Sequence, residues 1–223
     1  MNRRRVVALV DGFNLYHALD DLNFEGATKV FRSHKQHLKW LDLAGLARAF
    51  IQPSREELVG TWYFSAFATW LPAPYRRHLA YVKALQATSV RVVLGNFKEK
   101  HRSCQKCKAA WIAHEEKESD VNFAIHLLQL AYDNVFDKAL LLTADTDLVP
   151  AIPLVASKFS DKQLVAVIPE RRFGTALELR QACHQAMRIR EHHLSANLLP
   201  EQVTDAAGKV VATRPSKYSP PKP

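Results

Sequence analysis

Apolar residues follow two kinds of pattern along the chain, and the two alternate. Some runs are short and mainly apolar, and each predicts a strand; the run at 6–10, which is β-branched and has no polar alternation, predicts a strand buried on both faces. These runs span residues 6–10, 59–69, 90–94, 139–142 and 164–168, with a last short run at 187–189. Longer segments have apolar residues at helical spacing. They predict helices at 13–22, 38–50, 75–86, 121–132, 147–159 and 176–185.

Because strands and helices alternate, the sequence predicts an α/β fold, with a mainly parallel central sheet and helices on both faces. The 223 residues suit one substantial domain, which we expect over residues 1–199. Residues 200–223 have little amphipathic order and contain Ser, Pro and unpaired Lys, so we expect a flexible basic tail. In the helix at 121–132, one face carries Val121, Ala124, Ile125, Leu128 and Ala131.

The charge balance points to a polyanionic partner. Lys and Arg number 31 against 22 Asp and Glu, for a net charge of +9 and a pI near 9.6. A basic surface attracts phosphate, although a purely solubilising role of this excess is the alternative. Three cysteines are too few for a disulfide framework and indicate a reducing compartment. With no apolar stretch long enough for a membrane span, we expect a cytoplasmic protein.

Four aspartates occur where the predicted strands should end: Asp11, Asp120, Asp145 and Asp147. Open α/β sheets bind ligands at the carboxyl edge of their strands. Carboxylates gathered there repel one another unless a cation neutralises them, and hard divalent cations prefer oxygen ligands. The sequence therefore predicts a Mg²⁺ or Mn²⁺ site.

Each of these acids also has a structural interpretation. Asp11 alone would be a good N-cap for the helix that follows it. Asn14 lies one turn into that helix, on the same side, and its amide suits a water or a phosphate oxygen. Asp145 and Asp147 cannot both cap one helix, which favours metal. Thr143 and Thr146 supply hydroxyls that could orient a carboxylate, a water or a phosphate, and are candidate substrate contacts.

A charged insertion separates the predicted strand at 90–94 from the helix at 121–132. Residues 96–118 contain Lys98 and Arg102, which we expect to hold a phosphate backbone, and Trp111, which could stack on a base. Lys117 could meet a scissile phosphate as a point charge. Glu115 and Glu118 are interpreted as a solvated charged face.

The same insertion contains a CxxC motif. Cys104 and Cys107, flanked by His101 and His114, are ligand types for tetrahedral zinc. The second CxxC of many zinc sites is missing, so a basic loop with two reduced thiols is the alternative.

Three segments, VDGFNLYH, EEKESDVNFAIHLL and LLLTADTDLVPAI, resemble the signature blocks of the NYN domain family, which includes the LabA-like proteins and is a branch of the PIN-like nucleases. The resemblance covers residues 6–168. The resemblance implies a Rossmann-like, three-layer PIN-like fold. It also implies that the acidic residues bind Mg²⁺ or Mn²⁺ and that the protein cleaves RNA. The positions that match the family's catalytic residues are Asp11, Asn14, Asp120, Asp145 and Asp147. The last block reads Thr-Ala-Asp-Thr-Asp where the family often has Ser-Gly-Asp-Ser-Asp, which keeps the acids and hydroxyls.

The expected function is a metal-dependent ribonuclease, acting on single-stranded or structured RNA. DNA stays open as a substrate, because no residue visibly reads a 2′-hydroxyl, and a homodimer stays open as an assembly. The first alternative is a noncatalytic RNA-binding or regulatory module. The second is a metal-dependent phosphatase, which the missing DxD motif at the first strand disfavours. The sequence has no recognisable Ser-His-Asp set and no Gly-rich phosphate loop.

Overall fold

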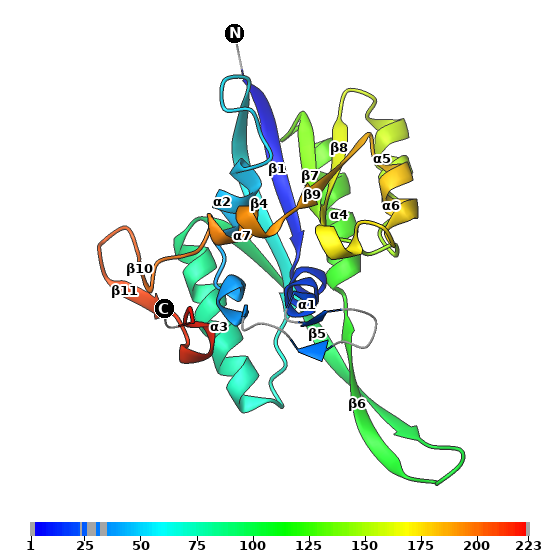
Figure 1. The fold of residues 1–223 in the computed structure, drawn as a ribbon. Helices are drawn as coiled ribbons and strands as arrows, with labels where there is room; N and C mark the ends of the chain where they lie inside the picture. Colours follow the sequence, from blue (N-terminus) through cyan, green and yellow to red (C-terminus); the bar gives the residue numbers. More distant parts are fainter. Residues whose placement is uncertain (1–2, 23, 26–29, 32–34, 222–223) are drawn as a thin grey trace.

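A seven-stranded sheet forms the centre of the structure (Figure 1). This computed structural model describes residues 3–22, 24–25, 30–31 and 35–221. The strand order is β6-β5-β4-β1-β7-β8-β9, and every neighbouring pair is parallel except β5 with β6. The strands are β1 (Arg4–Asp11), β4 (Glu56–Ala66), β5 (Val90–Ser103), β6 (Ala110–Lys117), β7 (Lys138–Leu142), β8 (Gln163–Pro169) and β9 (Gln185–Ile189).

The central strands are those with continuous apolar sequence. Residues 6–10 of β1 have 0% exposure, all of β7 is buried, and only the first residue of β8 is partly exposed. A strand can bury both of its faces only when other layers cover both faces of the sheet. The prediction of an α/β fold with a mainly parallel sheet is confirmed.

Helices cover both faces of the sheet, and the sheet separates two hydrophobic cores. Alternate residues of β1 point to opposite sides, so Val6, Ala8 and Val10 belong to one core, and Val7 and Leu9 belong to the other. The first core is closed by α1 (Gly12–Asp21), α2 (Leu43–Arg48), α3 (Pro72–Ala87) and α7 (Glu191–Ser195). The second is closed by α4 (Ser119–Tyr132), α5 (Ala151–Lys158) and α6 (Leu177–Ala182). These three layers are consistent with a PIN-like fold.

Shorter elements complete the described chain. They are β2 (Phe24–Glu25), β3 (Val30–Phe31), η1 (Gln36–Lys39), η2 (Glu170–Arg172), β10 (Gln202–Thr204), β11 (Val210–Thr213) and η3 (Ser216–Tyr218). Among the described residues, no helix combines the length and apolar character that crossing a membrane requires.

The insertion at 96–118 is a β-hairpin that projects from the sheet (Figure 1). β5 runs on past the predicted strand end at residue 94, and its outer half pairs antiparallel with β6, from Asn96 opposite Lys117 to Ser103 opposite Ala110. Lys108, in the connecting turn, has a φ of 57°. Charged residues on both faces hid this strand pair from the sequence pattern, because the hairpin arm is solvated on both sides.

The prediction of a flexible tail is wrong for residues 200–221, while residues 222–223 lie outside the described chain. β10 and β11 pair antiparallel, and Val203, Ala212 and Tyr218 are buried against Trp40 and Ala84. The indole nitrogen of Trp40 donates to the carbonyl oxygen of residue 200 over 2.8 Å. These three buried side chains are widely spaced in a polar segment, so the sequence shows no periodic pattern there. The surface that they bury is nevertheless enough to order the segment.

Two helices also differ from expectation. In α4, Val121 is 61% exposed and Ile125 is 54% exposed, whereas Phe123 and Leu127 are buried. The helix is apolar on several sides, so periodicity did not select the face that packs on the sheet. α5 begins at Ala151, because residues 146–150 form a bend and turn instead of the expected first helical turn.

Candidate metal centre

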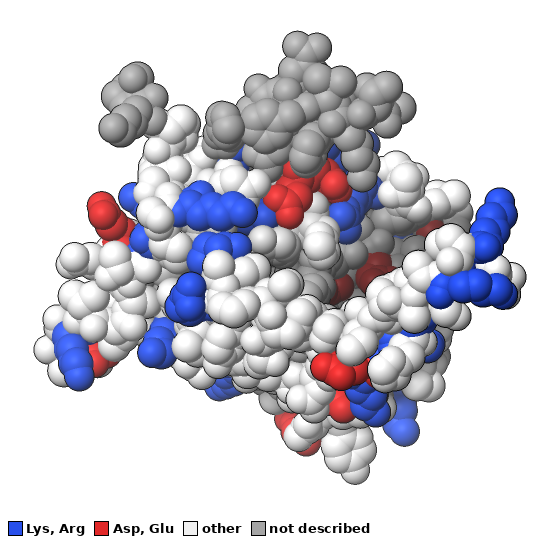
Figure 2. Space-filling model, turned by 90° about the horizontal axis from the view of Figure 1, so that it is seen from below, with Lys and Arg blue, Asp and Glu red and all other residues white. Residues whose placement is uncertain are grey.

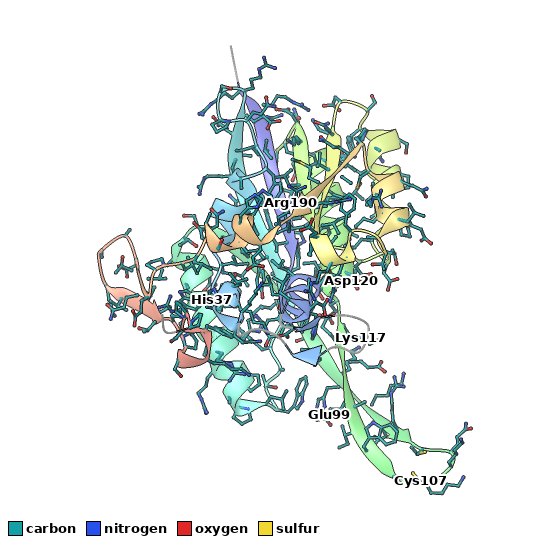
Figure 3. All side chains as sticks on the ribbon, in the orientation of Figure 1. His37, Glu99, Cys107, Lys117, Asp120 and Arg190 are labelled. Atoms are coloured by element: carbon teal, nitrogen blue, oxygen red, sulfur yellow. The ribbon has the colours of Figure 1, made fainter. Side chains whose placement is uncertain are left out.

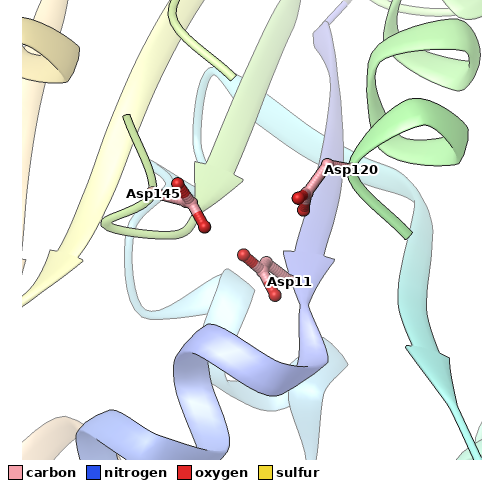
Figure 4. A group of neighbouring side chains, drawn as sticks. All are labelled: Asp11, Asp120 and Asp145. Atoms are coloured by element: carbon pink, nitrogen blue, oxygen red, sulfur yellow. The ribbon is translucent and has the colours of Figure 1, made fainter. Parts of the chain in front are cut away.

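Three aspartates from separate parts of the chain meet at the carboxyl edge of the sheet (Figure 4). Asp11 ends β1, Asp120 lies in the first turn of α4, and Asp145 follows β7. One carboxylate oxygen from each lies within 4.8 Å of the other two, and no other such group of three occurs among the described residues. We call Asp11, Asp120 and Asp145 the acid cluster. In the view from below, acidic atoms lie within a hollow of this face (Figure 2).

Asp11 is both a helix cap and a member of the acid cluster. Its Oδ1 accepts a hydrogen bond from the backbone amide of Asn14 over 3.0 Å, which makes it the N-cap of α1. Its Oδ2 accepts from the hydroxyl of Thr143 over 2.9 Å. Gly12 lets the helix start at once, because a Cβ there would lie 2.6 Å from the Tyr63 ring and 2.7 Å from a backbone oxygen of β4.

The loop that carries Asp145 is tied to β1 and α1 by hydrogen bonds. The hydroxyl of Thr143 accepts from the Asp145 amide over 3.0 Å, and the side-chain oxygen of Asn14 accepts from the Ala144 amide over 2.9 Å. Thr143 is 1% exposed, so its hydroxyl supports Asp11 and is closed to substrate. Asn14 and Thr143, predicted to contact ligand, hold the two strand ends together.

Asp120 owes its position to the start of α4. The N-cap of this helix is Glu118, in the left-handed region with a φ of 80°. The Ser119 amide donates to Oε1 of Glu116 over 3.2 Å. The carboxylate of Asp120 therefore does not cap the helix, and it points toward the end of β1 (Figure 4).

Burial and the charges of neighbouring carboxylates disfavour ionisation of Asp11 and Asp120. Burial raises the pKa of Asp11 to about 7, against the two hydrogen bonds that lower it, and the charges of Asp120 and Asp145 raise it further. Burial and the charges of Asp145, Glu116 and Asp147 raise the pKa of Asp120 to about 6. A cation bound between the three carboxylates would relieve both costs.

The donor set fits a hard divalent cation. All three side chains offer carboxylate oxygens, which Mg²⁺ and Mn²⁺ prefer, and none offers sulfur or imidazole. The acid cluster can therefore hold such a cation, with Asp11 fixed by its hydrogen bonds and Asp120 half-buried at the entrance.

Asp147 and Thr146, also predicted site residues, are exposed. Asp147 stands outside the group of three, although its charge is felt at Asp120. Its backbone amide donates to Oδ1 of Asp145 over 2.9 Å, which helps to orient that carboxylate.

The basic residues of the hairpin surround one glutamate. Arg102 bonds to Glu115, and the ammonium groups of Lys100 and Lys117 lie 3.5 Å and 3.4 Å from its carboxylate. The hydrogen bond from Arg102 is the main cause that lowers the pKa of Glu115 to about 2. Glu115, expected to be merely solvated, thus anchors the cationic surface, while Lys98 is exposed beside it.

The structure does not gather the four predicted zinc ligands. Cys104 and Cys107 are close, and hydrogen bonding from Cys107 lowers the pKa of the Cys104 thiol. His114 lies opposite Glu99, far down the hairpin from Cys107 at the tip (Figure 3). Cys104 lies five positions further along the chain than Glu99, which is roughly 16 Å for extended backbone. His114 instead stacks on Trp70, with ring centroids 3.8 Å apart, and His101 lies opposite Ile112.

Sequence reasoning missed Arg172, in the turn after β8. Its guanidinium donates twice to Oδ2 of Asp21, over 3.0 Å each, and once to the backbone oxygen of Asn14 over 3.3 Å. It therefore clamps α1 to the edge that carries the acid cluster. The basic pair Arg171-Arg172, close after the buried strand that ends at Pro169, was the available signal.

A model of the NYN domain matches residues 5–190. The crystal structure of a Vibrio parahaemolyticus protein of unknown function is similar in fold, with a TM-score of 0.53 and 17% sequence identity. The similarity covers 88% of this chain and 97% of that one. No curated protein matches the sequence.

Proposed function

The chain belongs to the NYN domain family, a family of PIN-like nucleases, and from this we propose that it is a ribonuclease that uses Mg²⁺ or Mn²⁺ to hydrolyse RNA phosphodiester bonds. The observation that carries the proposal is the acid cluster, where three carboxylates from distant parts of the chain converge within 4.8 Å. Carboxylates held this close destabilise one another, and a bound cation would offset that repulsion.

The acid cluster would hold the cation through Asp11, Asp120 and Asp145. When bound, a divalent cation stabilises negative charge on the phosphate and lowers the pKa of a water molecule. Asn14, Thr143 and their hydrogen bonds keep the ligand oxygens in place. Asp147, exposed beside the cluster, is assigned the outer position, where its carboxylate orients the attacking water.

The proposed reaction is hydrolysis, with water attacking phosphorus in line with the bond that breaks. Water attacks phosphorus and loses a proton, while the bond from phosphorus to the 3′-oxygen breaks and that oxygen gains a proton. The products are a 5′-phosphate and a 3′-hydroxyl.

The substrate would be held by the basic side of the hairpin. Lys98, Arg102 and Lys117 are exposed or half-exposed cations on an arm that begins next to Asp120, and Thr146 is an exposed hydroxyl beside Asp145. In the view from below, Lys and Arg side chains stand on both sides of the hollow (Figure 2). The net charge of +9 favours a polyanion. The three free cysteines suit a reducing compartment, and we propose the cytoplasm.

Purified protein and single-stranded RNA with Mn²⁺ test the proposal. We expect cleavage that EDTA abolishes, and a rate about 100-fold lower for Asp145→Asn, because one ligand is lost. The matched control is Glu178→Gln, an exposed acid on α6 that should cleave like the parent. If Asp145→Asn cleaves as fast as Glu178→Gln, the proposal fails. RNA binding that survives EDTA without any cleavage would instead identify a noncatalytic module, and a single-stranded DNA of the same sequence decides between RNA and DNA.

A further inference from the structure

A cavity of about 280 Å³ opens between α1, α3 and η3, whereas α4, which carries Asp120, packs on the other face of the sheet. Gly12 and Phe13, which directly follow Asp11, line it, as do residues at the end of β4. The cavity therefore adjoins the acid cluster through the chain itself. Its volume is close to the roughly 300 Å³ at which small-molecule sites begin.

The walls of the cavity are mainly aromatic, with Lys39 and Arg77 as the charged residues among them. They include the rings of Tyr16, Tyr63, Tyr81 and Tyr218, with His78. Burial raises the pKa of Tyr218 to about 12 and lowers that of His78 to about 4, so both are neutral at neutral pH. The phenol oxygen of Tyr63 lies 3.2 Å from Nε2 of His78.

These rings brace one another. Tyr63 meets Tyr81 edge-to-face, with ring centroids 5.9 Å apart, and the phenol of Tyr81 donates to the carbonyl oxygen of Leu41 over 3.0 Å. The aromatic walls are thus preformed, which lowers the entropy cost of ordering them around a ligand.

Arg77 also lines the cavity, and although its guanidinium bonds to Tyr218, one of its donors is unused. Nε of Arg77 is buried and has no hydrogen-bond partner among the described residues. A buried donor without an acceptor is costly, so its presence at a cavity indicates a ligand that supplies one. Lys39 also lines the cavity, where its ammonium lies 3.5 Å above the ring of Tyr16 and 2.6 Å from Oδ1 of Asp20.

We propose that this cavity binds a nucleobase. A base is flat, uncharged and rich in edge acceptors, which matches aromatic walls with one unsatisfied donor. The base has two available sources: a free nucleotide, or an unpaired nucleotide of an RNA strand that passes the acid cluster. Only the second source rests on the proposed function.

The first experiment titrates adenosine, guanosine, cytidine and uridine 5′-monophosphates into the protein in EDTA by calorimetry, with ribose 5-phosphate as the probe that lacks a base. At least one nucleotide should bind about tenfold more tightly than ribose 5-phosphate, because stacking supplies the difference. Equal binding of all five compounds, or no binding of any, overturns the proposal.

Two pairs of variants locate the binding. Ala68→Trp fills the cavity, whereas Ala73→Trp adds the same bulk to an exposed residue that does not line it. Arg77→Met removes the unused donor, and its neighbour Arg76→Met removes an exposed guanidinium. Ala68→Trp should weaken nucleotide binding about tenfold, and Arg77→Met about fivefold, with little change in either control. Should Ala68→Trp fail to fold, Arg77→Met decides, and wild-type affinity in Arg77→Met overturns the assignment.

The second experiment separates the two sources. If the base comes from RNA, Ala68→Trp raises KM for RNA about fivefold and leaves the turnover of bis(4-nitrophenyl) phosphate, which has no base, unchanged. An unchanged KM for RNA, with nucleotide binding lost, assigns the cavity to a free nucleotide. If the parent cleaves neither substrate, the proposed function fails while the titration still decides the cavity.

Discussion

The acid cluster and the aromatic cavity bury ionisable groups in opposite ways. The acid cluster holds carboxylates that are negative when they act, and burial raises the pKa of Asp11 to about 7. The aromatic cavity holds Tyr63 and His78, which burial keeps neutral. The acid cluster needs a cation to offset its charge, whereas the cavity needs none.

Under the two proposals, this difference separates the site of hydrolysis from the site of base recognition. Buried carboxylates are costly for the fold, but they suit a site that binds a cation next to a reacting phosphate. Neutral rings with one free donor suit a ligand that is selected by shape and hydrogen bonding. The two sites are adjacent in the chain, because Gly12 and Phe13 of the cavity lining directly follow Asp11 of the acid cluster.

The largest expected effect comes from removing negative charge from the acid cluster. Asp11→Asn should lower the rate of RNA cleavage in Mn²⁺ by about 100-fold or more, because a buried ligand is lost. Asp147→Asn should lower it only about tenfold, since this acid stands outside the group of three. Initial rates measure both effects, with Glu178→Gln as the control. An equal loss in the two variants would show that Asp147 is a full ligand.

Stability should fall with rising pH when no metal is present. The pKa of Asp11 is raised in the folded state, so its stabilising contribution is complete below about pH 4 and is lost as pH rises through about 7. The loss should be about 2–4 kcal/mol in the free energy of unfolding. Asp120 is half-exposed and contributes less.

Urea unfolding in EDTA at several pH values checks this prediction. Asp11→Asn should flatten the decline, and Mn²⁺ should restore stability at about pH 8 far more than at about pH 5, because only ionised carboxylates bind it. A parent protein with a flat profile and no gain from Mn²⁺ would contradict the account of the acid cluster.

The cavity should show the opposite pH dependence. The pKa of His78 is lowered to about 4, so its contribution is complete above about pH 6.5 and is lost as pH falls toward 4. We expect about 2 kcal/mol over this range. His78→Gln keeps a hydrogen-bonding partner for Tyr63 and removes the titration. The difference between parent and variant, measured by urea unfolding at each pH, should shrink toward pH 4, and a constant difference would mean that His78 does not titrate there.

The smallest effect concerns the hairpin and sharpens the comparison. Lys98→Ala should raise KM for RNA about two- to fourfold and reduce the salt dependence of binding by about one ion. It should leave the binding of a mononucleotide to the cavity unchanged. Lys158→Ala, an exposed lysine at the opposite edge of the sheet, is the control. Equal effects of the two variants would assign RNA binding to net charge alone.

Local sequence predicted the central strands and the places where they stop. The runs that form β1, β7 and β8 are apolar on both faces, and such runs are stable only inside a layered fold. Asp11 is the last residue of β1 and Asp145 comes shortly after the end of β7, so their position at the sheet edge was predictable from the sequence. The NYN signature segments predicted the family, which the match to residues 5–190 confirms.

Tertiary structure decided which acids meet and what surrounds them. Asp120 joins the cluster because α4 starts beside β1, and Asp147 stays outside because residues 146–150 form a bend and turn. The cavity combines residues from α1, β4, α3 and η3, and the segment that contributes Tyr218 has no periodic signal of its own. Apolar pattern determines whether a segment is buried and where it ends, since those depend on neighbours in the chain. Distances between remote side chains depend on strand order and helix packing, which only the folded chain establishes.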